Sequence, residues 1–186
     1  MNEFSTYEFV VKQKTEGKWI LARIAMIALY VAFVLAWVVI GIKGFAALLA
    51  LVPVTLWILI FFTWRYVSVE YEYSITSGEL RFSKIFGGRS RRTCLTLQLR
   101  NAVRIAPLEN AEEAKKAEAY APEREFSAIS SLRAPDIYFV LFEYEFKEHG
   151  KTKKRRAILY FEATAKALQI CRFYNPSATL MTSVTR

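Results

Sequence analysis

The chain has 186 residues, of which 54% are hydrophobic, with a mean hydropathy of +0.18 and a formal net charge of +9. This length allows one ordinary domain with additions, and the apolar content argues against a purely soluble one. The distribution of charged residues shows where the apolar excess lies.

A long apolar stretch occupies residues 24–64, where Lys43 is the only charged residue. It is thereby divided into two uncharged runs, 24–42 and 44–64. An α-helix rising about 1.5 Å per residue needs about 20 residues to cross about 30 Å of hydrocarbon, so each run can span a bilayer. The rest of the chain is too short to wrap two helices that are apolar on all sides. We therefore predict two transmembrane helices.

The orientation of these helices follows from the flanking charges. A turn of only Lys43-Gly44 forces an antiparallel hairpin, with both ends on one side of the membrane. Lysine and arginine residues are concentrated outside the two spans, and the positive-inside rule then places both termini in the cytoplasm. The predicted parts are an N-terminal cytoplasmic segment, a transmembrane hairpin and a cytoplasmic domain, at residues 1–18, 19–65 (helices 19–42 and 44–64) and 66–186.

The interior of the spans gives little sign of transport. Neither span contains an Asp, Glu, His or Arg in its interior, so no proton relay or ion path is indicated. The first run is longer than the apolar region of a signal peptide and is followed at once by a second span, so we expect it to be retained. Pro53 should kink the second helix, and the Thr55 hydroxyl is available to a freed carbonyl.

Alternation of apolar and polar residues begins at Tyr66 and is typical of half-buried strands. The Ala-rich segment 109–120 has little apolar face, so we expect an exposed, mobile helix. Thr164 is a plausible N-cap for a final helix. The N-terminal stretch 7–14 alternates weakly and is a candidate to pair with a sheet edge. The expected strands are 67–75, 80–86, 94–99, 102–108, 126–132, 137–146 and one through Arg156, Ile158 and Tyr160, followed by a helix at 165–174.

About seven strands and one amphipathic helix predict the fold class. A long antiparallel sheet buries only one face unless it curls, and a terminal helix can plug the open end. We expect a membrane α-hairpin plus a β-rich (α+β) cytoplasmic domain, a pleckstrin-homology-like curled sheet or barrel with a C-terminal helix. The central position in the sheet is expected for strand 137–146, which is apolar on both faces over most of its length.

Two stretches carry a family resemblance: "VEYEYSITSGELRFSKIFGGRSRR" at 69–92 and "FYNP" at 173–176. They resemble a family of small membrane proteins of Gram-positive bacteria, in which a transmembrane hairpin precedes a bacterial pleckstrin-homology-like domain. The resemblance covers nearly the whole chain and implies a multi-pass protein of the bacterial plasma membrane. No activity or site residue comes with it, and the insertion at 109–120 departs from a compact barrel.

Catalytic and cofactor sites are not indicated. His149, the sole histidine, falls in a predicted turn, where a solvated residue is the ordinary interpretation. Cys94 and Cys171 have no CxxC partner and should be reduced thiols. The Gly87-Gly88 pair joins two strands and lacks the helix N-terminus of a phosphate-binding loop. We therefore expect no enzyme activity, no metal and no cofactor.

Glu143 and Glu145 lie two residues apart on a strand and so point to the same face, as an acid/base pair would. The neighbouring strand offers a run of cations at 153–156. Cross-strand ion pairing explains such carboxylates more simply.

Basic residues cluster at two predicted hairpins. Beneath an anionic leaflet each can contribute about 1 kcal/mol of attraction. "KIFGGRSR" has the cation spacing of phosphoinositide-binding hairpins, but this spacing is common in basic turns, so non-specific attraction to inner-leaflet lipids is favoured. Nucleic acid is not expected, because exposed stacking aromatics are missing. The candidate contacts with lipid or partner are Lys84, Arg89, Arg91, Arg92, Lys151, Lys153, Lys154 and Arg155.

The leading functional hypothesis is a non-enzymatic, membrane-tethered adaptor that binds a protein partner through a sheet edge or contacts the leaflet through its basic hairpins. The alternative is an accessory subunit of a membrane enzyme or transporter. It would have a small-ligand pocket in the barrel lined by Tyr71, Tyr73, Phe82 and Tyr138. Such aromatics are more typical of an ordinary core.

Overall fold

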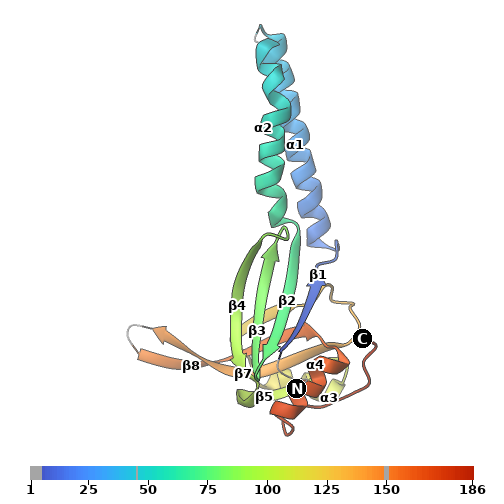
Figure 1. Ribbon diagram of the computed structural model, residues 1–186, viewed down its shortest axis with the longest axis vertical. Coiled ribbons are helices and arrows are strands. Elements are labelled where there is room, and N and C mark those ends of the chain that lie inside the picture. Colours follow the sequence, from blue (N-terminus) through green and yellow to red (C-terminus); the bar gives the residue numbers. More distant parts are fainter. Residues whose placement is uncertain (1–5, 45, 149–150) are drawn as a thin grey trace. The chain divides into compact units, whose positions relative to one another are not determined.

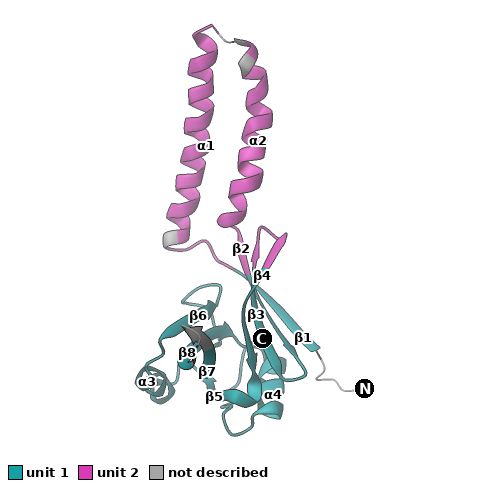
Figure 2. Cartoon of the chain, turned by 90° about the vertical axis from the view of Figure 1, so that its left-hand side faces the viewer, with its two compact units in different colours: residues 1–12, 71–84, 92–186 teal, residues 13–70, 85–91 magenta. Residues whose placement is uncertain are grey.

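The computed structural model describes residues 6–44, 46–148 and 151–186 (Figure 1). They form two compact units (Figure 2). The hairpin unit contains residues 13–70 and 85–91, and the sheet unit contains the described residues of 1–12, 71–84 and 92–186. Three strands have one end in each unit.

Four helical segments follow one another in the hairpin unit: α1 (Lys18–Ile42), the 3-10 helix η1 (Ala46–Leu51), α2 (Val52–Thr63) and the 3-10 helix η2 (Trp64–Tyr66). The kink predicted at Pro53 is not found. Pro53 stands in the first turn of α2, where its missing N–H breaks no helical hydrogen bond. The Thr55 hydroxyl donates to the carbonyls of Leu51 and Val52, at 2.9 and 3.2 Å. The second predicted span is therefore a 3-10 segment followed by an α-helix.

The helices of the hairpin contact each other at the middle of α1 and near the turn. The hydroxyls of Tyr30 and Thr63 are hydrogen-bonded at 2.7 Å. Near the turn, a Cβ on Gly41 would lie 2.6 Å from the Leu49 side chain, so a larger residue at this position would require that side chain to shift. Within the described residues, the segments 19–42 and 49–66 are long and apolar enough to cross a membrane. In the most apolar 18 residues of each, only 11% and 0% of the residues are buried. Their length, composition and exposure point to membrane association.

The first sheet has the order β1-β2-β3-β4, formed by β1 (Thr6–Lys12), β2 (Val69–Thr76), β3 (Glu79–Phe86) and β4 (Ser90–Gln98). The first three expected strands of the domain pair in chain order, as β2, β3 and β4, and form a meander. The N-terminal stretch does pair with the edge of this sheet, beside β2.

The second sheet has the order β5-β7-β8-β6, formed by β5 (Ala102–Pro107), β6 (Arg124–Ala128), β7 (Ile137–Glu148) and β8 (Lys151–Glu162). Strand β7 lies between two others, as expected, while β6 is parallel to β8 and ends four residues before the predicted strand does. The strand predicted at 102–108 does not extend the first meander, because the 3-10 turn η3 (Leu99–Asn101) redirects the chain into the second sheet. His149 lies outside the described residues.

Two helices cover the sheet unit. Helix α4 (Ala165–Tyr174) has the predicted N-cap, since the Thr164 hydroxyl accepts a hydrogen bond from the Ala167 N–H at 3.2 Å. Helix α3 (Ala111–Ala119) is largely exposed, as predicted, but one side packs on the sheet: Ala117 is buried, and the buried Glu113 carboxylate is paired with Arg104 of β5. Its mobility stays a prediction. The α+β class is confirmed, and the two sheets remain open rather than closing into a barrel.

Candidate functional site

The β3–β4 turn packs against the end of the second membrane-candidate helix, within the hairpin unit. The Gly87 N–H donates to the Ser68 carbonyl at 2.7 Å, and the Arg89 N–H donates to the Phe86 carbonyl at 3.2 Å. Gly87 has φ +58°, and a Cβ at this position would lie 2.8 Å from the Arg65 Cβ. Glycine is therefore needed both for the backbone conformation and for close contact with Arg65.

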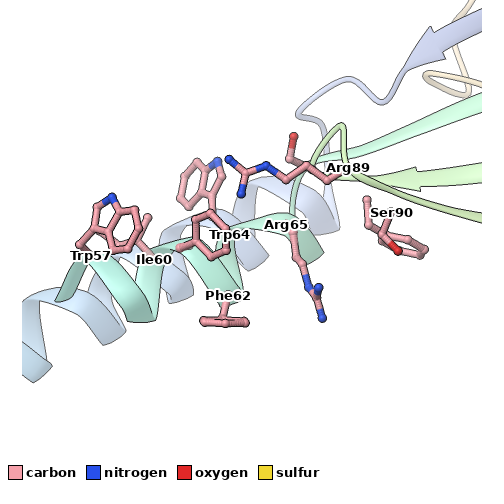
Figure 3. A pocket seen from close by; sticks show the side chains of 11 residues that line it. Trp57, Ile60, Phe62, Trp64, Arg65, Arg89 and Ser90 are labelled. Carbon is pink, nitrogen blue, oxygen red and sulfur yellow. The ribbon is translucent and has the colours of Figure 1, made fainter. Parts of the chain in front are cut away.

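A pocket of about 320 Å³ lies beside this contact (Figure 3). The guanidinium carbon of Arg89 is 4.3 Å from the centroid of the Phe61 ring, a cation–π geometry. In Figure 3 the Arg89 side chain extends toward Trp64, whereas Arg65 points the other way. Arg65 itself donates to the Tyr66 hydroxyl at 2.9 Å. The lining residues are Trp57, Ile60, Phe61, Phe62, Trp64, Arg65, Ser68, Phe86, Gly87, Arg89 and Ser90.

Aromatic and cationic side chains thus gather at one end of the hairpin unit. Arg23, from the first turns of α1, donates to the Val67 carbonyl at 3.4 Å, which joins the beginning of α1 to the end of η2. Trp64 and Tyr66 are exposed. Aromatic rings beside arginine at the end of an apolar helix are typical of a membrane interface.

The first predicted basic cluster is only partly brought together. Arg91 and Arg92 are exposed on β4, and Lys84 on β3 is half-buried with its Nζ 5.6 Å from the Tyr71 ring centroid. Of this cluster, only Arg89 lines the pocket. The pocket aromatics Trp57 and Phe61 were not identified from the sequence. A usable signal was their spacing of four residues, which puts both on one face of a helix ending in arginine.

The second predicted cluster lies on β8, in a two-stranded extension that we call the β7–β8 ribbon, residues 143–148 and 151–156. Strand β5 pairs with β7 only as far as Phe142, and β6 pairs with β8 only from Ala157. The β7–β8 pairing continues to the last described pair, Glu148 with Lys151. Figure 1 shows the ribbon projecting from its sheet. The described part of the chain gives it no third strand.

Charge on the ribbon follows the strand register. Glu143 is opposite Arg156 and Glu145 is opposite Lys154, which fits the predicted cross-strand pairing of these carboxylates. Lys153 and Arg155 alternate with them and therefore point to the other face. Arg155 also approaches Glu123, with Nε 3.4 Å from Oε2. For Lys151 the structure gives the strand position, opposite Glu148.

The four aromatics proposed as a pocket lining belong to the packed core. Tyr71 is 7% exposed, and Tyr73, Phe82 and Tyr138 are at most 1% exposed. The Tyr73 hydroxyl donates to the Glu162 carbonyl at 2.9 Å, and burial raises the pKa of Tyr73 far above its usual value. These rings are packed against other side chains of the core; the centroids of Tyr71 and Phe82, for example, lie 6.1 Å apart.

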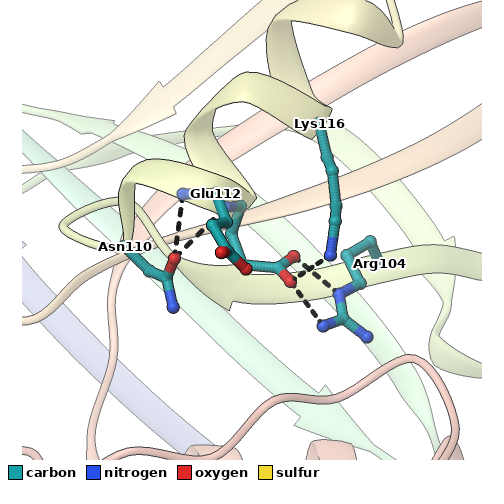
Figure 4. Close-up of polar contacts among 5 residues, drawn as sticks. Arg104, Asn110, Glu112 and Lys116 are labelled. Carbon is teal, nitrogen blue, oxygen red and sulfur yellow. Dashed lines mark hydrogen bonds and ion pairs between the residues drawn. The ribbon is translucent and has the colours of Figure 1, made fainter.

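Two further polar groups are buried in the sheet unit. Burial raises the pKa of the Cys171 thiol to about 12, so it stays protonated near neutral pH. Glu113 of α3 accepts two hydrogen bonds from Arg104 of β5, at 2.7 and 2.8 Å, and one from Lys116 at 2.8 Å (Figure 4). These donors hold the pKa of Glu113 at about 2. Among the described residues, no group of three His, Cys, Asp or Glu side chains could hold a metal ion.

Comparison with known proteins gives one family. The family described as "Bacterial PH-like domain (DUF6106)" matches residues 3–181, nearly the whole sequence. No curated protein and no solved structure gives a significant match.

Proposed function

The chain belongs to this family of bacterial PH-like domains, and from that premise we propose that it is a non-enzymatic adaptor anchored in the bacterial plasma membrane. The hairpin of α1 and α2 crosses the membrane twice, with both termini in the cytoplasm. The PH-like part then displays its sheets on the cytoplasmic face, where they bind a partner protein.

The β7–β8 ribbon is the observation that carries the adaptor proposal. Its outer edges have no neighbouring strand among the described residues, although at its base the Arg156 carbonyl accepts a hydrogen bond from the Glu123 N–H at 2.9 Å. By contrast, the outer edge of β5 is covered by residues 178–180, through hydrogen bonds to Ile105. An unpaired strand edge offers N–H and C=O groups that an extended peptide can use.

The packed core favours this adaptor over the alternative of a ligand-binding accessory subunit. The aromatic rings that would line a barrel pocket are buried against one another: the centroids of Tyr73 and Phe161 lie 5.4 Å apart. Binding through an exposed edge needs no internal cavity.

Cysteine labelling tests the topology. In intact cells, a cysteine at Lys43 should react with a membrane-impermeant maleimide added from outside, and a cysteine after Arg186 should react only after the membrane is permeabilised. The opposite pattern would contradict the proposed orientation.

Proximity labelling with the full chain tests the adaptor role. A matched variant replaces residues 145–154 by Asn-Gly, a sequence that closes two-residue hairpins, so that Tyr144 and Arg155 stay paired while the ribbon is shortened. We expect the intact chain to label a reproducible set of proteins and the shortened ribbon to lose at least one of them. Identical labelling by both chains, or no reproducible partner of the intact chain, would refute the adaptor proposal. Lys115→Glu, an exposed change on α3, serves as the charge control.

A further inference from the structure

We infer that the pocket at the end of α2 binds one anionic phospholipid, with the lipid phosphate at Arg89 and an acyl chain along Trp57 and Phe61. The inference rests on the membrane insertion in the proposed function, but not on the ribbon or its partner. It assigns a specific lipid contact to Arg89 and none to the other basic residues of the same hairpin.

The pocket has the shape that a lipid needs. From Trp57 to Arg65 the chain advances eight helical residues, about 12 Å along the axis at 1.5 Å per residue. The last two turns of α2 contribute apolar side chains to the pocket lining, and the segments that follow α2 and form the β3–β4 turn contribute Arg65, Ser68, Arg89 and Ser90 together with Trp64 and Phe86. A volume of about 320 Å³ is within the range of small-ligand sites and fits part of a lipid.

The position of Arg89 provides the charge. Its guanidinium is held over the Phe61 ring, and the structure pairs it with no carboxylate in the described part of the chain. A guanidinium with a fixed plane can present two N–H donors to a phosphate. The contact of Gly87 with Arg65 and Ser68 fixes the position of the β3–β4 turn, and this places Arg89 at the pocket.

Arg92 provides the matched comparison. It is exposed on the same hairpin and carries the same charge, but it does not line the pocket. If attraction were only the sum of surface charges, the loss of Arg89 or Arg92 would have the same effect.

Quenching of tryptophan fluorescence by brominated lipids measures occupancy. Of the four tryptophans, Trp57 and Trp64 line the pocket, so Trp19→Phe with Trp37→Phe leaves only these two reporters. The full chain is placed in phosphatidylcholine vesicles containing a minor fraction of either brominated phosphatidylglycerol or brominated phosphatidylcholine. Salt at about 1 M shortens the Debye length to about 3 Å and removes long-range attraction.

At high salt we expect the anionic brominated lipid to quench more than the zwitterionic one. Arg89→Gln should lower this preference about tenfold and Arg89→Lys several-fold, because charge-assisted bonds from the fork are lost, while Arg92→Gln should leave it unchanged. Equal quenching by the two lipids, or equal effects of Arg89→Gln and Arg92→Gln, would overturn the site. A fall in phosphatidylcholine quenching in Arg89→Gln would assign Arg89 a packing role only. Absence of quenching by either lipid would instead refute membrane insertion itself.

Discussion

The contact between Arg104 and Glu113 should decide whether α3 stays on the sheet. Arg104 donates from Nε and Nη2 to the two carboxylate oxygens of Glu113, whose side chain is 5% exposed. Lys116 reaches the same carboxylate from the next turn of α3. Arg104→Ala would leave the carboxylate buried with one partly exposed partner, so we expect α3 to open more often.

The magnitude follows from the pKa of Glu113, which its partners lower from 4.5 to about 2. One pKa unit corresponds to about 1.4 kcal/mol, so the ionised form is stabilised by about 3 kcal/mol in the folded chain. Arg104 is 27% exposed and Lys116 is 59% exposed, so water screens part of this interaction. We assign about 2 kcal/mol to Arg104, which is about a 30-fold change in the opening equilibrium.

Hydrogen exchange of the amides of α3 in the full chain measures this opening. At pH 7, Arg104→Ala should raise the exchange rates about 30-fold. Lys116→Ala removes an exposed pair between residues three positions apart and should raise the rates only about twofold. The comparison is matched because both substitutions remove a cation from the same carboxylate.

The pH dependence has a definite sign. Because the folded pKa of Glu113 is depressed, the stabilisation is fully present above pH 4.5 and is lost as pH falls toward 2. The ratio of variant to parent exchange rates should therefore shrink across that interval. Equal effects of the two substitutions, or a ratio independent of pH down to 2, would refute the assignment of Glu113 as a buried carboxylate held by Arg104.

Two other predictions concern glycine and cysteine. Gly87→Ala should lower the melting temperature of the detergent-solubilised chain more than Gly88→Ala, because both have positive φ but only the first places a Cβ against Arg65; equal losses would show that the turn is not held by that contact. In the native chain at pH 8, a maleimide should modify Cys94 and not Cys171, whose thiol is buried and protonated, and unfolding should expose both; native modification at Cys171 would contradict its position in the core.

Local features of this protein can be predicted from the sequence because they depend on neighbouring residues. The uncharged runs on either side of Lys43 are sufficient to predict two apolar helices, since no tertiary contact is needed to satisfy their backbone. Alternation with period two predicts β2, and the hydroxyl of Thr164 predicts the beginning of α4. The first helix, β2 and α4 lie within about two residues of their predicted positions, while the second helical run is divided into a 3-10 segment and α2.

The pairing of strands that are distant in the sequence could not be predicted from patterns of neighbouring residues. Strand β5 has a pattern as suitable for the first sheet as for the second, and the parallel alignment of β6 with β8 depends on the path through α3. The contact of α3 with the sheet was also not predicted, because the sequence of this helix lacks an apolar face. An ion pair holds its buried side, and a search for hydrophobic periodicity cannot detect an ion pair.

At the candidate lipid site, too, the sequence predicts one part and the tertiary structure supplies the other. From the sequence, Arg89 and Arg92 are equivalent cations in one basic turn, and their number alone predicts attraction to an anionic membrane. Both are exposed, and the packing of Gly87 against Arg65 distinguishes them, because it places Arg89 over the Phe61 ring at the pocket while Arg92 lies outside the pocket. Composition thus predicts an attraction of this protein for a charged membrane, while the tertiary contact at the end of α2 decides which arginine faces a pocket.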